Sequence, residues 1–334
     1  MSVLRGRAAG ALVGLCVLFG AQASAVASPW TLPKDELSLS LGYDFQFADH
    51  EYTAPLVGGG DIPAGNYQRF PLEGEFSQST LTFAGRYGFT DRFEGSFALD
   101  FKQVAFTSQS YLAALPDAGG LAETRDEIVN FADTSVGAGD LRLAGRYNLH
   151  RSWWLATAEV QAKLPTGYEP PTGTTVARGD GQMDVTPAIL LGVFIPQTST
   201  FARADAGYNL RLGGPGHQAL GGVKVGQFLG DHVILFGGIS GAYTLFEGEP
   251  LEADNFIARD PSIPKRDFGP EDFIIQPLTL DKNFARVEAG FIFRLRQLEF
   301  QAGYNYIFAG QNIPALHSFS LASVITIPDA TAEE

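Results

Sequence analysis

Residues Leu37–Phe47 read Leu-Ser-Leu-Ser-Leu-Gly-Tyr-Asp-Phe-Gln-Phe, so large apolar side chains alternate with polar or small ones throughout. In an extended strand this period of two produces one apolar face and one polar face. A strand of this length can cross the hydrocarbon layer of a membrane at a tilt. It can equally belong to a soluble β-sandwich, so the choice depends on how the pattern recurs.

The alternating pattern recurs about twelve times along the chain, and no run longer than a turn or two has helical spacing. This predicts an all-β protein, a transmembrane antiparallel up-and-down β-barrel of about twelve strands. The predicted strands are Leu37–Phe47, Ser79–Phe89, Phe93–Gln103, Asp140–Leu149, Trp153–Leu164, Asp184–Ile195, Phe201–Arg211, Gly221–Gln227, Val233–Phe246, Phe284–Leu295, Leu298–Phe308 and Ser318–Ile327.

The connections between these strands alternate between tight and long. The joins at 90–92, 150–152, 196–200, 228–232 and 296–297 are tight, and the others include long runs at 48–78, 104–139, 165–183 and 247–283. Outer-membrane barrels have short periplasmic turns and long external loops. A soluble sandwich has no reason to sort its connections in this way, so the alternation favours a barrel in a bacterial outer membrane.

Charged residues lie on only one face of the predicted strands, which we assign to the lumen. A lipid-facing Arg or Lys at the bilayer midplane costs about 2–4 kcal/mol, which explains their absence from the other face. Nine acids and ten bases share the lumen face, Glu94 and Arg211 among them. The other predicted lumen charges are Asp44, Arg86, Asp100, Lys102, Asp140, Arg142, Arg146, Glu159, Lys163, Asp184, Arg203, Asp205, Lys224, Arg286, Glu288, Arg294 and Glu299.

Part of the predicted lumen wall is apolar or small. Small inward residues on the predicted strands at 221–227 and 233–246, Gly238 and Ala242 among them, suggest that this wall is thin, and the inward aromatic residues Phe236 and Phe284 lie on or beside it. An apolar groove beside a charged wall suits an amphipathic or aromatic solute. Alternatively, the aromatic side chains merely fill the bore. The lumen charges, likewise, either pair and close the bore or leave water between them.

The N-terminus has the features of a secretory signal peptide. Arg5 and Arg7 precede the apolar run Ala8–Phe19, and overlapping small-x-small sites end at Ala27. We therefore predict a signal peptide at 1–27 and a single barrel domain at 28–334, with strands about 37–327 and an acidic tail at 328–334. A mean hydropathy of only +0.02 argues against a helical membrane protein.

Four short motifs together resemble a known family. They are Trp30–Glu36, Tyr87–Phe93, Gly137–Leu143 and Leu164–Gly167. In this order they resemble the outer-membrane "MetA-pathway of phenol degradation" transporter-like β-barrel family, which is distantly similar to fatty-acid and aromatic-hydrocarbon outer-membrane channels. The resemblance implies uptake of hydrophobic or aromatic compounds. Only 28–36 precede the first strand, so we do not expect the N-terminal hatch of the fatty-acid channels.

The sequence offers little for catalysis or metal binding. Its five histidines lack ligand spacing, so we predict no metal site and no cofactor. His317-Ser318 is the one pair that suggests a barrel lipase, but Ser318 falls on the lumen side of its strand. The net charge of −14 disfavours nucleic-acid binding. The acidic loops suit a solvated surface or cation bridging to lipopolysaccharide phosphates.

The leading hypothesis is a passive outer-membrane channel for small hydrophobic or aromatic compounds, with no catalytic residues. The alternatives are a barrel enzyme that modifies envelope lipids and a closed structural or adhesive barrel. The expected partners are outer-membrane lipid, lipopolysaccharide, the solute and the barrel assembly machinery. We expect a monomer.

Overall fold

The computed structural model describes residues 29–54, 64–70, 73–111, 128–168, 176–249, 254–258, 273–277 and 279–328. The predicted signal peptide and nearly all of the acidic tail lie outside these ranges, so both stay predictions. Among the described residues, no helix is long and apolar enough to cross a bilayer.

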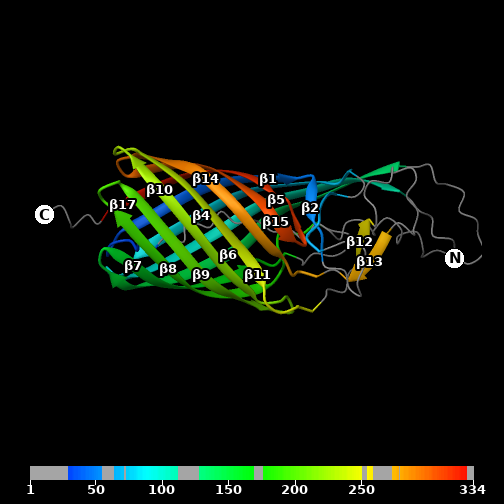
Figure 1. Ribbon diagram of the computed structural model, residues 1–334, viewed down its shortest axis with the longest axis horizontal. Helices are drawn as coiled ribbons and strands as arrows, with labels where there is room; N and C mark the ends of the chain where they lie inside the picture. The colour runs from blue at the N-terminus through cyan, green and yellow to red at the C-terminus, as the bar shows by residue number, and fades with distance from the viewer. Residues whose placement is uncertain are drawn as a thin grey trace, which may run out of the picture.

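Twelve antiparallel strands close into a barrel, as the sequence predicted, and Figure 1 shows them tilted along its long axis. Each strand pairs with its neighbour in sequence order, and β1 pairs with β17 to close the barrel. The barrel strands are β1 (Leu37–Ala48), β4 (Glu75–Gly88), β5 (Phe93–Tyr111), β6 (Ile128–Arg151), β7 (Trp154–Pro165), β8 (Met183–Ile195), β9 (Thr200–Leu212), β10 (Gln218–Leu229), β11 (Val233–Thr244), β14 (Asn283–Leu295), β15 (Leu298–Gln311) and β17 (His317–Ile327).

Alternation along these strands sorts the side chains as the sequence predicted. In β1, Leu41 is 50% exposed on the outer face, whereas Asp44 is buried on the inner face. The same parity runs around the barrel, because each ladder holds paired residues on one face. The outer face is a belt of exposed apolar side chains that includes Leu41, Phe83, Leu99, Leu143, Val160, Leu191, Val223, Ile239, Phe291, Phe300 and Leu321.

The two ends of the barrel differ. We call the end with the five short connections the turn end and the opposite end the loop end. Beyond the loop end lies a two-stranded sheet of β12 (Asp254–Ala258) and β13 (Phe273–Pro277), visible in Figure 1. A three-stranded sheet there joins β2 (His50–Tyr52), β3 (Tyr67–Arg69) and β16 (Ile313–Pro314).

One expected loop is partly a hairpin. The sequence predicts an external loop at 104–139, but β5 and β6 continue pairing from Phe101–Ala138 up to Tyr111–Ile128. The register shifts between Leu99 and Phe101. This bulge lets the two strands bend and remain paired well beyond the predicted strand ends.

A hydrophobic core fills part of the barrel at the loop end. Inward side chains of the barrel strands meet side chains from the loop segments, among them Phe70, Val176 and Leu280. This core could not be predicted from the sequence, because its members lie far apart in the chain. It comprises Ala48, Tyr52, Phe70, Phe76, Val104, Phe106, Val176, Leu280, Ile307, Ile313, Ala315 and Leu316.

Candidate functional site in the barrel lumen

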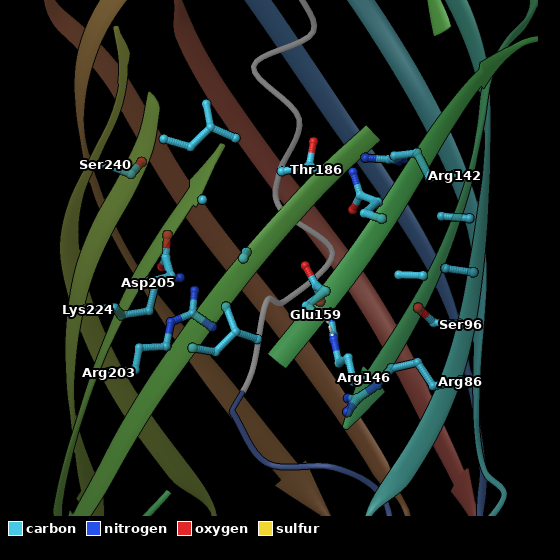
Figure 2. A pocket seen from close by; sticks show the side chains of 18 of the residues that line it. Arg86, Ser96, Arg142, Arg146, Glu159, Thr186, Arg203, Asp205, Lys224 and Ser240 are labelled. Atoms are coloured by element: carbon cyan, nitrogen blue, oxygen red, sulfur yellow. Dashed lines mark hydrogen bonds and ion pairs between the residues drawn. The ribbon is translucent and has the colours of Figure 1, made fainter. Parts of the chain in front are cut away.

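The lumen contains a cavity of about 920 Å³. All twelve barrel strands contribute inward side chains to its wall, from Ser38 and Ser40 in β1 to Val324 and Thr326 in β17. Figure 2 shows charged side chains pointing into it from facing walls. A cavity of this size suits a small organic solute.

Most of the predicted lumen residues line this cavity. Asp44, Glu94, Asp100, Gly238 and Glu288 do not; Asp44, Glu94 and Asp100 are buried in the wall at 8%, 0% and 1% exposure. Whether the lining residues act in solute passage stays a prediction. Those that line the cavity are Arg86, Lys102, Asp140, Arg142, Arg146, Glu159, Lys163, Asp184, Arg203, Asp205, Arg211, Lys224, Phe236, Ala242, Phe284, Arg286, Arg294 and Glu299.

One wall carries a ladder of charges across four strands. Glu94, Arg146 and Glu159 are directly opposite one another in β5, β6 and β7. Glu94 is fully buried. Its carboxylate accepts hydrogen bonds from Arg86 Nη2 at 2.7 Å and from Arg146 Nη1 at 3.2 Å. Arg146 Nε also donates to Glu159. The register therefore turns a sequence pattern of single charges into a continuous paired network.

A second charged cluster lies nearer the loop end. Asp180 accepts hydrogen bonds from Lys163 Nζ at 2.6 Å and from Arg211 Nη2 at 3.0 Å. Lys163 also forms an ion pair with Asp184 at 2.8 Å. Asp180 belongs to the connection between β7 and β8, which the sequence analysis placed outside the barrel. The structure corrects this, because 176–182 fold against the inner wall. Lys163 and Arg211 are buried in the wall, and burying their charges without a partner would be costly. The ion pairs with Asp180 therefore explain why this segment folds inward.

The opposite wall, formed by β9, β10, β11 and β14, combines charges with aromatic rings. Lys224 pairs with Glu288 at 2.8 Å, and its Nζ lies 4.6 Å from the ring centroid of Phe236. Arg286 Nε donates to Ser240 Oγ at 2.8 Å. Ion pairing and cation–π contact keep these charges compensated while apolar surface remains beside them.

The expected thin wall is in fact covered by neighbouring side chains. Phe201 lies on Gly226, leaving no room for a Cβ there, and Phe236 lies on Gly290. A Cβ at Gly238 would lie 2.7 Å from the Val223 carbonyl oxygen. The glycines thus allow close packing of rings and carboxylates instead of widening the bore. The sequence could not show this, because the covering side chains come from adjacent strands.

The candidate lipase pair is separated in the structure. His317 Nδ1 lies 2.7 Å from the Tyr304 hydroxyl and the His317 ring stacks with Phe47 on the outer face. Ser318 is buried on the inner face at 1% exposure. Within the described ranges, no group of three or more His, Cys, Asp or Glu residues could hold a metal ion.

Solved structures with the same architecture include known outer-membrane barrels. An outer membrane channel from Pseudomonas putida F1 matches with a TM-score of 0.61 and 12% identity, over 90% of this chain and 99% of that one. The translocator domain of the autotransporter NalP from Neisseria meningitidis has a TM-score of 0.41 and 13% identity, over 88% and 89%. A mutant of the TodX monoaromatic hydrocarbon channel has a TM-score of 0.41 and 9% identity, over 92% and 94%.

The match to the Pseudomonas putida channel agrees, at the level of the fold, with the predicted resemblance to outer-membrane channels. The fold is that of an outer-membrane β-barrel. No protein-family model and no curated protein matches the sequence.

Proposed function

We propose that this protein is a passive outer-membrane channel for small hydrophobic or aromatic compounds. The observation that carries the proposal is the cavity of about 920 Å³ that is lined by all twelve strands. The belt of exposed apolar side chains around the barrel supports residence in a bilayer. An outer membrane channel also shares its fold.

The chemistry of the lumen supports a solute that is partly apolar. Phe236, Phe284 and Ile292 line the cavity beside charged groups that are held in ion pairs. Paired charges exert a weak net field, so they do not repel a neutral solute, while apolar rings offer dispersion contacts. We expect neither a cofactor nor energy coupling. Association with lipopolysaccharide and with the assembly machinery stays a prediction. The monomeric state is likewise a prediction.

The enzyme alternative is less well supported. A nucleophile and its base must lie within hydrogen-bond reach of each other, but Ser318 and His317 face opposite sides of the barrel wall. The closed structural barrel is the second candidate, because the loop-end core narrows one mouth.

Solute flux into proteoliposomes separates the channel from the closed barrel. A small aromatic glycoside is a suitable probe, because its sugar makes it cross a protein-free bilayer only slowly. We expect vesicles with the purified protein to take it up faster than empty vesicles. Equal rates for this probe and for every small sugar tried would reject the channel and favour the closed barrel.

A further inference from the structure

The eight residues before β1 do not extend away from the barrel. Pro29 is buried, and Trp30, Thr31 and Leu32 line the lumen cavity. The absence of an N-terminal hatch was predicted from the shortness of this segment. The structure shows that even a segment this short enters the lumen. We call residues 29–36 the strap.

The inner part of the strap contacts three strands across the turn end. Pro29 accepts a hydrogen bond from Thr157 Oγ1 in β7 at 2.6 Å. The indole ring of Trp30 packs edge-on against Phe201 in β9, with centroids 6.0 Å apart. A Cβ at Gly192 in β8 would clash with Pro29 and approach the indole of Trp30 within 3.1 Å, so this glycine makes room for both.

A buried carboxylate holds the strap to the wall formed by β4 and β5. The Leu32 amide donates to Glu94 Oε2 at 2.8 Å, and Arg86 Nη2 donates to the Trp30 carbonyl at 3.1 Å. Glu94 is completely buried and is also the acceptor for Arg86 and Arg146. Hydrogen bonds to charged groups are the stronger class, so this anchor fixes the backbone immediately after Trp30, while the bond from Thr157 to the Pro29 carbonyl fixes it just before.

The outer part of the strap is fastened to the end of β4. The Asp35 amide donates to the Gly88 carbonyl at 2.7 Å, and the Gly88 amide donates to the Glu36 carbonyl at 3.0 Å. Asp35 has a φ of +62°, and its carboxylate accepts the Tyr87 hydroxyl at 2.9 Å. This left-handed residue turns the chain from β1 back into the lumen. The strap is therefore held at both ends, with Trp30 between them.

From this arrangement we infer that Trp30 is the size-determining residue of the channel at its turn end. The inference rests on the proposed function. The backbone next to Trp30 is held at the β4–β5 wall and the indole contacts Phe201 in β9, so both rings lie in the path of a solute that leaves the lumen at this end. The anchors limit how far the indole can withdraw. Passage is thereby restricted to molecules that fit beside a fixed aromatic edge.

A series of solutes of increasing size tests this inference. We would measure the flux of aromatic glycosides with one, two and three sugars into proteoliposomes containing wild-type, Trp30→Ala or Trp30→Phe protein. Trp30→Ala should raise flux of the larger members several-fold and leave that of the smallest nearly unchanged. Trp30→Phe should fall between the two. Trp153→Ala is the matched control, because Trp153 is 77% exposed in a turn-end connection.

A chemical block gives a second readout. Cys16 is the only cysteine and lies within the predicted signal peptide, so Trp30→Cys introduces a single thiol into the mature chain. Attachment of a bulky aromatic thiol reagent should return the size limit toward the wild-type value. If the size limit is unchanged in Trp30→Ala while small solutes still pass, the inference about Trp30 is wrong but the proposed function stands. If no solute passes wild type or Trp30→Ala, the proposed function itself fails.

Discussion

Ser40 and Leu41 are neighbours in β1, yet Ser40 lines the lumen cavity and Leu41 is exposed on the outer face. In β6, Leu143 is likewise exposed at 43%, whereas Ala144 has the parity of the buried residues Arg142 and Arg146. At this scale the environment of a side chain follows from its parity along the strand. Sequence alone predicts it wherever the alternation is unbroken.

Arginine substitutions test this assignment. Leu41→Arg and Leu143→Arg should each destabilise the inserted barrel by about 2–4 kcal/mol, because the charge enters hydrocarbon. Ser40→Arg and Ala144→Arg place the same side chain in a polar lumen and should be better tolerated. The fraction of heat-modifiable, folded protein in outer membranes measures the difference. Equal losses at both parities would show that the assignment of faces is wrong.

Glu51 provides a test of pH dependence outside the membrane-spanning strands. Its carboxylate is buried in β2 and accepts Gln68 Nε2 at 2.9 Å, and burial raises its pKa from 4.5 to about 8. The folded sheet therefore binds this proton more tightly than the unfolded segment does. The stability so gained is fully present below pH 4.5 and is lost as the pH rises through about 8.

We therefore expect the sheet of β2, β3 and β16 to open more readily at pH 9 than at pH 6. Glu51→Gln should remove most of this change, because its amide has no proton to lose. Amide hydrogen exchange in this sheet, compared between the two proteins at each pH, is the measurement. An identical pH response in both would assign it to another group.

At the scale of elements, all twelve strands could be predicted, because alternation and turn residues are local signals. The inward fold of 176–182 and the strap at 29–36 could not. Their positions depend on partners far away in sequence, such as Arg211 for Asp180 and Glu94 for Leu32. Phe201 on Gly226 is a similar case, since which ring covers a glycine depends on the register between strands.

The charge ladder across β4, β5, β6 and β7 has a predictable energetic consequence. Arg146→Ala leaves Glu94 and Glu159 without one of their buried partners, so it should lower the free energy of unfolding by about 3–5 kcal/mol. Arg294→Ala breaks a pair with Glu299 whose side chains are 41% and 25% exposed, and should cost only about 0–1 kcal/mol. Equilibrium unfolding in urea from lipid vesicles gives both values. Similar losses of unfolding free energy in the two variants would show that the buried ladder contributes no more than an exposed ion pair.

The last strand allows a prediction about the acidic tail. β17 ends at Ile327, which pairs with Leu37 and completes the closure with β1. Because closure needs nothing beyond this residue, deletion of 328–334 should leave membrane insertion and heat-modifiable mobility intact. Failure of the shortened chain to insert would show that the tail takes part in assembly.

For the whole molecule, the loop-end core and the strap occupy parts of the lumen toward its two ends, and residues of the strap and of all twelve strands line the cavity. The sequence predicted the barrel and the charged inner face. Whether the charges and rings fill or merely line the lumen depends on three-dimensional packing. The cavity shows that they leave space, and we propose that solutes cross the outer membrane through that space.

The most direct measurement is the initial uptake rate of a labelled monoaromatic compound by porin-depleted cells that express the wild-type protein, Ala144→Trp or Ala289→Trp. Ala144 lines the cavity, whereas Ala289 is exposed on the outer face of β14. Both variants add the same side chain, so they differ only in the side of the wall that it occupies. Ala144→Trp should reduce protein-dependent uptake several-fold, and Ala289→Trp should match wild type. Equal uptake by both variants, at equal levels of folded protein, would contradict passage through the lumen.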